Sequence, residues 1–407
     1  MTSTLVPPTT DRRPFRLRHG AGFWVIAAAF LAVMAFSTVP TPLYAFYQAR
    51  DGFPTWVVTV IFAAYAVGVI ASLFLVGHVS DWAGRRRMVL VAVLVEIVAA
   101  ALFLFWNDVA GLIVARTLSG IGVGALTASA TAHLSELRAV ARPQEAPRLA
   151  GTVSTVVNTG GLALGPLIGG AFAQFLPAPL LLPYAVFLVV LAVAAVAVAL
   201  VPETVERAEE RPAYRPQRIS LPASARGAFS AAATAAFAGF AVFGLFTSLA
   251  PSVLAGTLHQ TSHLLAGAVP FGVFAASALS QIVFARLSSR AQLKLALTLM
   301  LVGLAGLAAG VVVASLGVFI VSGILAGAGV GLQFRSAIAA AASLAAPERR
   351  GEVLAAIFLI AYIGLALPVL LVGVALILWP LVPVLVVFVA AVAVLSVVAG
   401  AGMLRRG

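Results

Sequence analysis

The sequence predicts an all-helical membrane protein in which twelve transmembrane helices form two pseudo-symmetric bundles of six. Of its 407 residues, 62% are hydrophobic and only 9% are charged, and the mean hydropathy is +1.11. This composition leaves too little polar surface to cover a water-soluble globule of that size. Apolar stretches of about 20 residues, the length that crosses roughly 30 Å of hydrocarbon as a helix, recur along the whole chain.

Each apolar stretch runs continuously in alanine, leucine and valine, which favours helices over the alternating strands of a membrane β-barrel. Successive loops then lie on alternate sides of the membrane. The predicted spans are 22–48, 54–76, 88–106, 109–135, 150–176, 180–201, 227–255, 265–285, 293–314, 317–344, 352–378 and 380–403.

The basic residues predict the orientation of the chain. With a cytoplasmic N-terminus, 22 of the 25 lysines and arginines lie on the cytoplasmic side, Arg50 lies outside, and Arg116 and Arg335 lie within spans. Because positive loops stay in the cytoplasm, we expect both termini there, in a bacterial inner membrane. The formal net charge of +12 then reflects topology and attraction to anionic lipid, and it requires no nucleic-acid partner.

Several absences narrow the function. The chain has no cysteine, which excludes disulfides and thiolate chemistry. His259 and His263 lie four residues apart, but no third ligand accompanies them, so we predict no metal site. No catalytic cluster or phosphate-binding loop is apparent, so we expect no enzyme activity and no cofactor. An ion gradient, rather than ATP bound to this chain, is the expected energy source.

One long polar segment divides the chain. Residues 202–226 hold five arginines and several prolines between two sets of six spans, and this composition is typical of a solvated connector. We therefore predict an N-terminal six-helix bundle over 1–201, a cytoplasmic linker over 202–226 and a C-terminal six-helix bundle over 227–407.

The two halves repeat each other. The glycine pattern of 120–124 recurs at 327–331, an offset of 207, and Gly-Leu-Ala-Leu at 161–164 recurs at 364–367, an offset of 203. Two matches in corresponding spans indicate parallel six-helix repeats, which is how the halves of a large class of transporters are related.

The turn between the second and third spans concentrates charge in an apolar chain. Residues 77–87 read Gly-His-Val-Ser-Asp-Trp-Ala-Gly-Arg-Arg-Arg. Glycine permits close helix approach and unusual turn angles, and Asp81 can pair with Arg85 or Arg86 or cap a neighbouring helix. An ordinary positive turn explains the arginines alone, but the spacing of glycine, acid and glycine favours a specific interaction.

This turn resembles the signature loop of the major facilitator superfamily. Leu112-x-x-x-Arg116-x-x-x-Gly120-x-Gly122-x-Gly124 resembles the fourth-helix motif of the same family, and Pro202-Glu203-Thr204 closes the sixth span as it often does there. The resemblance implies a conformational latch that holds the halves together in the outward-facing state. Its residues are Gly77, Asp81, Gly84, Arg85 and Arg86.

The fifth span carries a glycine face interrupted by proline, formed by Gly161, Gly165, Pro166, Gly169 and Gly170. Glycine at every fourth position gives a smooth face, and proline removes a backbone hydrogen bond, so the helix can rock against a close partner. The pattern resembles the antiporter motif of the drug:proton antiporters. A simple packing face is the alternative.

Ionisable residues within spans point to function, because a charge at the bilayer centre costs roughly 2.5–3.5 kcal/mol on insertion scales. Glu96 in the third span is the only acid deep in the membrane, and hence the only deep carboxyl that can carry a proton. A packing role with a hydroxyl or amide partner is the alternative, since the third helix is peripheral in the family that the chain resembles. The resemblance implies that Arg116 helps to govern proton movement; a structural pairing is the alternative.

Further polar residues are candidates for the substrate and proton pathway. Arg335 in the tenth span follows Gln333; it either extends towards the cytoplasmic face or contacts substrate from the cavity wall. Asn158 in the fifth span either lines a path or bonds between helices. Phenylalanines at three-residue spacing in the seventh span, 237 to 246, fit either an aromatic cavity or lipid-facing packing.

These observations predict a secondary active transporter that binds a small molecule and works as a monomer. The leading hypothesis is a proton-coupled exporter of small organic molecules or drugs that operates by alternating access. A proton-coupled importer or uniporter of sugars or organic acids is a second hypothesis, and a non-transporting membrane sensor is a third. The antiporter-like fifth span and the scarcity of polar groups in the cavity favour export.

Overall fold

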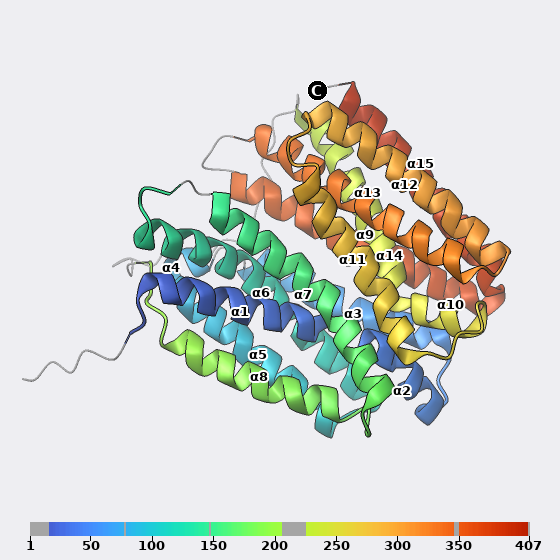
Figure 1. Ribbon diagram of the computed structural model, residues 1–407, viewed down its shortest axis with the longest axis horizontal. Coiled ribbons are helices and arrows are strands. Elements are labelled where there is room, and N and C mark those ends of the chain that lie inside the picture. The colour runs from blue at the N-terminus through green and yellow to red at the C-terminus, as the bar shows by residue number, and fades with distance from the viewer. Residues whose placement is uncertain (1–15, 77–78, 146–147, 206–224, 346–349, 406–407) are drawn as a thin grey trace, which may run out of the picture.

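The computed structural model describes residues 16–76, 79–145, 148–205, 225–345 and 350–405. Within these ranges all regular structure is helical, and twelve helices are long and apolar enough to cross a membrane. The predicted fold class is therefore confirmed, and each predicted span overlaps one of the twelve (Figure 1).

The helices follow one another without long connections in the described ranges. Their bounds are α1 His19–Thr38, η1 Thr41–Leu43, α2 Tyr44–Asp51, α3 Thr55–Val76, α4 Ser80–Ala83, α5 Arg85–Phe105, α6 Val109–Ala141, α7 Arg148–Phe175, α8 Leu182–Ala199, α9 Arg226–Ser248, α10 Ala250–Gly256, α11 His263–Val283, α12 Ser289–Val312, α13 Leu316–Ser343, α14 Arg350–Leu378 and α15 Leu381–Leu404.

Two predicted spans are interrupted where the sequence expectation had one continuous helix. The first breaks after Thr38, and a 3-10 turn precedes α2. Pro40 and Pro42 lie in this break, and proline has no backbone N–H to continue a helix. The seventh span breaks between α9 and α10, where Pro251 occupies the first turn of α10.

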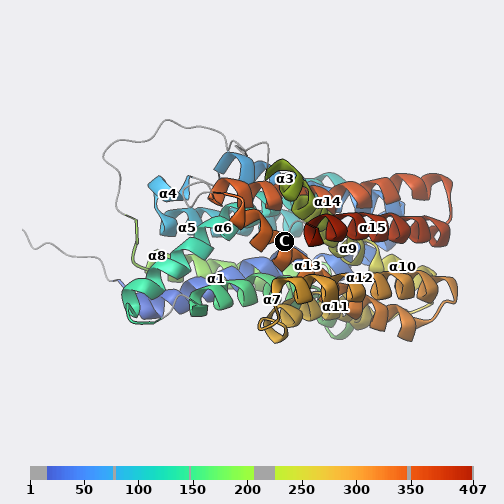
Figure 2. The ribbon, with the colours of Figure 1, turned by 90° about the horizontal axis from the view of Figure 1, so that it is seen from above.

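The helices form two groups, seen in Figure 1 as a blue-to-green group and a yellow-to-red group. Helices α1 to α8, the first bundle, pack mainly with one another, and α9 to α15, the second bundle, do the same. The bundles meet chiefly along two helix pairs, α7 with α11 and α3 with α14 (Figure 2). Exchanging the two bundles maps one pair onto the other, as pseudo-two-fold symmetry requires.

An even number of spans places both termini at one end of the molecule, here called the terminal face; the other end is the opposite face. Near the opposite face the bundles are in close contact, because a Cβ atom on Gly267 of α11 would lie 2.1 Å from the carbonyl oxygen of Pro166 in α7. Gly151, in the first turn of α7 near the terminal face, has no neighbouring atom within 4 Å of such a position, and neither has Gly160 near the middle of the helix. The bundles therefore converge towards the opposite face.

The repeated glycines of α6 and α13 make equivalent contacts. A Cβ on Gly120 would lie 2.0 Å from the carbonyl oxygen of Tyr65 in α3, and one on Gly327 would lie 2.3 Å from that of Val273 in α11. The central glycine of each pattern contacts a different helix: Gly122 faces α5, and its counterpart Gly329 faces α12. Glycine is required because backbone fills the space that a side chain would need.

Replacing Gly120 by leucine should destabilise the protein, because the new side chain meets the immobile backbone of α3. Overpacking of this kind costs about 1–3 kcal/mol or more. The matched control is Gly160→Leu, which points into open space and should change stability by less than about 0.5 kcal/mol. Thermal unfolding in detergent checks both variants, and equal melting temperatures would contradict the packing described.

Candidate functional site

Arg116 of α6 is a buried cation within the first bundle, with 3% of its surface exposed. Its Nη1 donates to the carbonyl oxygen of Ser37 in α1, and its guanidinium carbon lies 4.3 Å from the ring centre of Tyr65 and 5.9 Å from that of Phe62. Aromatic faces attract cations, so two rings and one carbonyl stabilise the charge, and no carboxylate of the described residues forms an ion pair with it. Its Nε has no hydrogen-bond partner among the described residues.

Glu96 of α5 is completely buried and lies within electrostatic reach of Arg116. Its carboxyl group fits against Gly122, where a Cβ atom would lie 2.7 Å from Oε1. Ser119 and Arg116 are the polar neighbours that interact with this carboxyl. Even so, neither carboxyl oxygen has a hydrogen bond of ordinary geometry with a described residue, and the same is true of the Ser119 hydroxyl.

A buried carboxyl without a partner is costly, and more so when it is charged. The second bundle shows that the fold does not need it: the repeat offset of 207 pairs Glu96 with Gly303 of α12, and the atoms closest to the central glycine of α13, Gly329, are backbone atoms of Met300 and Ala296. The repeat offset of 207 also pairs Arg116 with Gly323 and Ser119 with Ala326. The same architecture is thus built without these polar side chains in the second bundle.

The other predicted pathway residues are placed away from this pair. Gln333 of α13 is buried, and its Nε2 donates to the carbonyl oxygen of Ala235 in α9 at 2.9 Å. The Nη1 of Arg335 donates to the carbonyl oxygen of Gln281 near the end of α11. Asn158 is half-buried on α7. The structure therefore brings Glu96 and Arg116 together, and it leaves these three on helices of the bundle interface and of the second bundle.

An aromatic cluster lies next to this pair and crosses between the bundles. The Tyr65 ring that covers Arg116 is 6.5 Å from Tyr362 of α14, centre to centre, and Tyr362 is 5.6 Å from Phe240 of α9. Phe240 contacts Phe334 of α13, which contacts Phe358 of α14. Phe240 was singled out by its spacing in the sequence; the others carried no periodic signal, because they come from separate helices.

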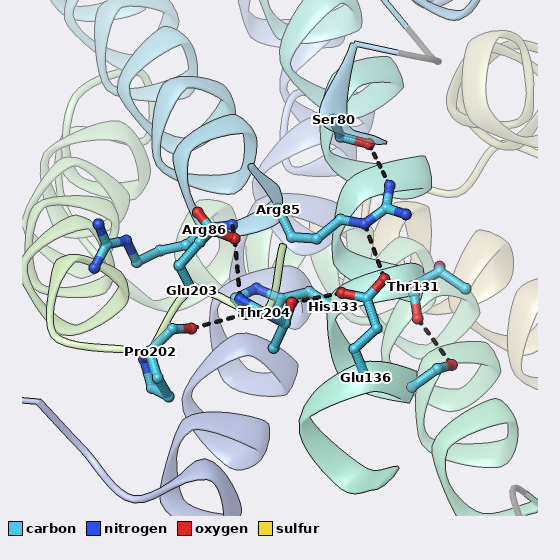
Figure 3. Close-up of polar contacts among 10 residues, drawn as sticks. Ser80, Arg85, Arg86, Thr131, His133, Glu136, Pro202, Glu203 and Thr204 are labelled. Atoms are coloured by element: carbon cyan, nitrogen blue, oxygen red, sulfur yellow. Dashed lines mark hydrogen bonds and ion pairs between the residues drawn. The ribbon is translucent and has the colours of Figure 1, made fainter. Parts of the chain in front are cut away.

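The turn proposed as a latch is tied to the end of the first bundle at the terminal face (Figure 3). The guanidinium of Arg85 donates to Glu136 of α6 at 3.1 Å and to Ser80 at 2.7 Å. Glu136 also accepts a short hydrogen bond from the Thr204 hydroxyl. Gly77 lies outside the described residues, as does the side chain of Asp81, so the role assigned to them stays a prediction.

A second set of contacts in Figure 3 fastens the segment after α8 to the same turn. Glu203 accepts from the backbone N–H of Arg86 at 3.2 Å. Gly84 has φ +104°, and a Cβ there would lie 2.5 Å from the Glu203 carboxylate, so only glycine fits both the backbone angle and the space. His133 of α6 lies 3.1 Å from the carbonyl oxygen of Pro202. Sequence reasoning missed Glu136 and His133, which no motif marked.

The glycine face of α7 joins three helices. Gly161, Gly165 and Gly169 lie against α1 and the turn that follows it, at close range to the backbone of Leu31, Ala35 and Val39 respectively. Gly170 instead faces α11, where a Cβ would lie 2.7 Å from the carbonyl oxygen of His263. Pro166 lies inside α7. One helix thus packs closely both within its own bundle and across the interface.

The nearby Gln174 strengthens that crossing. Its Oε1 accepts from the backbone N–H of His263 at 3.0 Å, at the first turn of α11. The Phe46 ring of α2 also packs on the His263 ring at 4.3 Å. Polar and aromatic contacts therefore reinforce the glycine contact near the opposite face.

Comparison with known proteins gives this arrangement its context. Residues 26–369 match the family described as the Major Facilitator Superfamily. The chain belongs to this superfamily. It is therefore a multi-pass secondary transporter of small molecules and not an enzyme.

Individual members of the superfamily are more distant. The multidrug efflux pump LfrA of Mycolicibacterium smegmatis is 32% identical over 195 residues, which are 44% of this chain and 36% of that protein. The puromycin resistance protein pur8 of Streptomyces alboniger is 33% identical over 163 residues, which are 39% and 31% of the two chains. The matched region spans about a third of the length of these relatives.

Solved structures share the fold over almost the whole chain. The human organic anion transporter MFSD10 has a TM-score of 0.70 at 16% identity, covering 95% of this chain and 100% of that one. A bacterial homolog of the human lysosomal transporter Spinster, in an inward-facing conformation, has a TM-score of 0.68 at 14% identity, covering 95% and 96%. At these identities the likeness shows the fold alone.

Replacing Glu136 by alanine should destabilise the first bundle by about 1–2 kcal/mol, because Arg85 and Thr204 lose their charged partner in a partly buried site. The matched control is Glu145→Ala at the same face, where the carboxylate pairs with Arg138 and is 42% exposed. Exposed pairs contribute about 0–1 kcal/mol. Thermal unfolding should therefore show the larger decrease for Glu136→Ala, and the reverse order would contradict the network in Figure 3.

Proposed function

We propose that this superfamily member exports small lipophilic organic molecules in exchange for protons, and that Glu96 carries the proton. The observation that supports this most is the buried, unpartnered carboxyl of Glu96 beside the Arg116 guanidinium. A protonated carboxyl is neutral and tolerates an apolar site, whereas a carboxylate needs the nearby cation. A proton-coupled transporter requires a group of this kind, whose protonated and ionised forms are stable in different surroundings.

The same geometry suggests how proton loss moves helices. A carboxylate on Glu96 would draw Arg116 away from the carbonyl oxygen of Ser37, which holds α6 to α1. Helix α1 packs in turn on α7, where the Thr38 hydroxyl donates to the carbonyl oxygen of Leu162 at 3.1 Å. Helix α7 packs on α11 of the second bundle at Gly170. A continuous series of contacts therefore links the proton site to the bundle interface.

Orientation and domain division belong to the same proposal. The distribution of basic residues supports a cytoplasmic terminal face, so this conformation opens inwards. Residues 1–201 and 227–407 then rock about their interface, and 202–226, most of which lies outside the described residues, connects them as a linker. The latch of residues 77–87 would hold the bundles together in the outward-facing state, and the protein would act as a monomer.

The aromatic cluster supports a lipophilic substrate. Phe240, Phe334 and Phe358 are half-buried and offer ring faces, which bind planar apolar groups without specific hydrogen bonds. The printed names of two relatives, a multidrug efflux pump and a puromycin resistance protein, support export as the direction and puromycin as a first probe.

In proteoliposomes loaded with puromycin, a pH gradient should drive counter-transport by the unmodified protein. Glu96→Gln and Arg116→Ala should each abolish the response to the gradient. The first variant has no titratable group at position 96, and the second has no cation to balance the charge of an ionised Glu96. Glu145→Gln, an equivalent change at the exposed surface, is the control and should behave as the unmodified protein does.

Puromycin exchange at equal pH on both sides separates coupling from binding, and Glu96→Gln should retain it. If both variants still respond fully to the pH gradient, Glu96 is not the proton carrier. If the unmodified protein exchanges neither puromycin nor any of a broad panel of lipophilic drugs, the export proposal fails.

A further inference from the structure

We propose that the buried tyrosines Tyr44, Tyr47 and Tyr184 form a hydrated proton route from the opposite face to Glu96. The route runs through the interior of the first bundle and is separate from the substrate path between the bundles. This inference rests on the proposed function, because it assumes that Glu96 binds the transported proton.

The first observation is the burial of three tyrosine hydroxyls that have no hydrogen bond of ordinary geometry, although the hydroxyls of Tyr47 and Tyr184 face each other. Tyr44 is 2% exposed, and Tyr47 and Tyr184 are completely buried. Within the described residues, none of the three hydroxyl oxygens makes a hydrogen bond of ordinary geometry. A buried polar group left unsatisfied costs about 1–3 kcal/mol, and buried polar groups are normally satisfied by protein or by ordered water. Water is therefore the partner expected at these oxygens.

The second observation is that these groups follow one another from the surface to Glu96. Tyr47 interacts with the Arg50 and Asp51 charges at the end of α2, and with the hydroxyls of Tyr44 and Tyr184 deeper in the bundle. Tyr44 and Tyr184 lie within the electrostatic field of Arg116.

The series ends at the proton site. The groups that face Glu96 from the surrounding helices are Arg116 and Ser119 of α6 and Tyr65 of α3. Arg116 is thus the cation that acts on both the tyrosines and the carboxyl, and it links the tyrosines to Glu96.

The third observation is an open hollow in the surface, lined by residues next to two of these tyrosines in the sequence. Its lining includes Arg50 of α2, Asn107 after α5 and Leu181 before α8. Arg50 is three residues from Tyr47 in the sequence, and Leu181 is three residues from Tyr184. The Arg50 guanidinium bonds Asn107 across the hollow at 2.9 Å. Charged and amide groups at the entrance give water a polar point of entry.

A packing role explains the tyrosine rings but not their hydroxyls. The Tyr184 ring stacks on Phe103 at 4.6 Å, and phenylalanine would stack equally well. In the second bundle, the segment after the break, α10, reads Ala-Pro-Ser-Val-Leu-Ala-Gly and has no tyrosine. A small apolar cavity lies there instead, lined in part by Ala250, Leu307 and Phe319. The fold is thus built at the related place without a tyrosine.

The position of Arg116 gives the route a gate. A fixed cation opposes the passage of protons along a chain of water. When Glu96 is ionised, its negative charge offsets the guanidinium, and a proton can pass from the tyrosine hydroxyls and their waters to the carboxylate. Once Glu96 is protonated, the uncompensated cation closes the route. Protons would then enter one at a time and would not leak.

Infrared difference spectroscopy of the full-length protein in lipid tests the route without any substrate. The carboxyl band of protonated Glu96, assigned as the band that Glu96→Gln removes, shifts when D₂O replaces water. In the double variant Tyr47→Phe and Tyr184→Phe, this shift should be slower by about tenfold or more, because each lost hydroxyl removes a partner in the proton chain. Ser248→Ala and Ser396→Ala, which remove equally buried unpartnered hydroxyls from the second bundle, are controls and should exchange at the original rate.

The outcomes separate the two proposals. An assigned band that exchanges at the original rate in the double variant overturns the tyrosine route and leaves Glu96 as the proton carrier. The absence of any band removed by Glu96→Gln, at every pH tested, overturns the proton-carrying role itself. Thermal unfolding shows whether the double variant is folded; we expect it to be at least as stable as the unmodified protein. If the double variant is less stable, the single variants Tyr47→Phe and Tyr184→Phe provide the same test, and the Glu96 band should exchange more slowly in each of them.

Discussion

The close approach of α6 to its neighbours is the constraint on which the rest of the structure depends. Gly120 and Gly124 bring it against the backbone or side chains of α3, and Gly122 leaves room for Glu96 from α5. Because hydrocarbon offers no partner for polar groups, any polar group enclosed by these contacts must find its hydrogen-bond or charge partner within the bundle. The glycines therefore set both the packing of the first bundle and the chemical environment of its buried acid and cation.

The repeat separates the features that both bundles share from those that occur in one bundle alone. Both bundles use the same glycine spacing, and both central helices pack in the same way. The polar residues differ: at the repeat offset of 207, Glu96 and Arg116 have Gly303 and Gly323 as counterparts. A transporter needs two bundles that move against each other, but one proton site is enough. In the proposed function, a proton site confined to the first bundle would leave the second free to provide aromatic side chains for a lipophilic molecule.

The sequence was sufficient to predict the twelve spans, the superfamily and the repeat, because hydropathy and glycine spacing can be read from short stretches of the chain. It also singled out Glu96 and Arg116, since charges are rare within spans. It could not place one near the other, because their separation depends on how α5 lies against α6. The roles of Glu136 and of the aromatic cluster were equally out of reach, as their members come from helices far apart in the chain. The breaks after Thr38 and before Ala250 were missed because apolar composition continues through them.

The central claim is that Glu96 is present for its proton and not for packing. The most direct measurement uses Glu96→Met, which keeps an unbranched side chain of similar length but removes the titratable group. Purified protein in weakly buffered detergent receives puromycin, and a pH-indicator dye reports proton release. Linkage between substrate and proton binding predicts release of about one proton per unmodified protein and none from Glu96→Met. Equal release from both proteins would contradict the account.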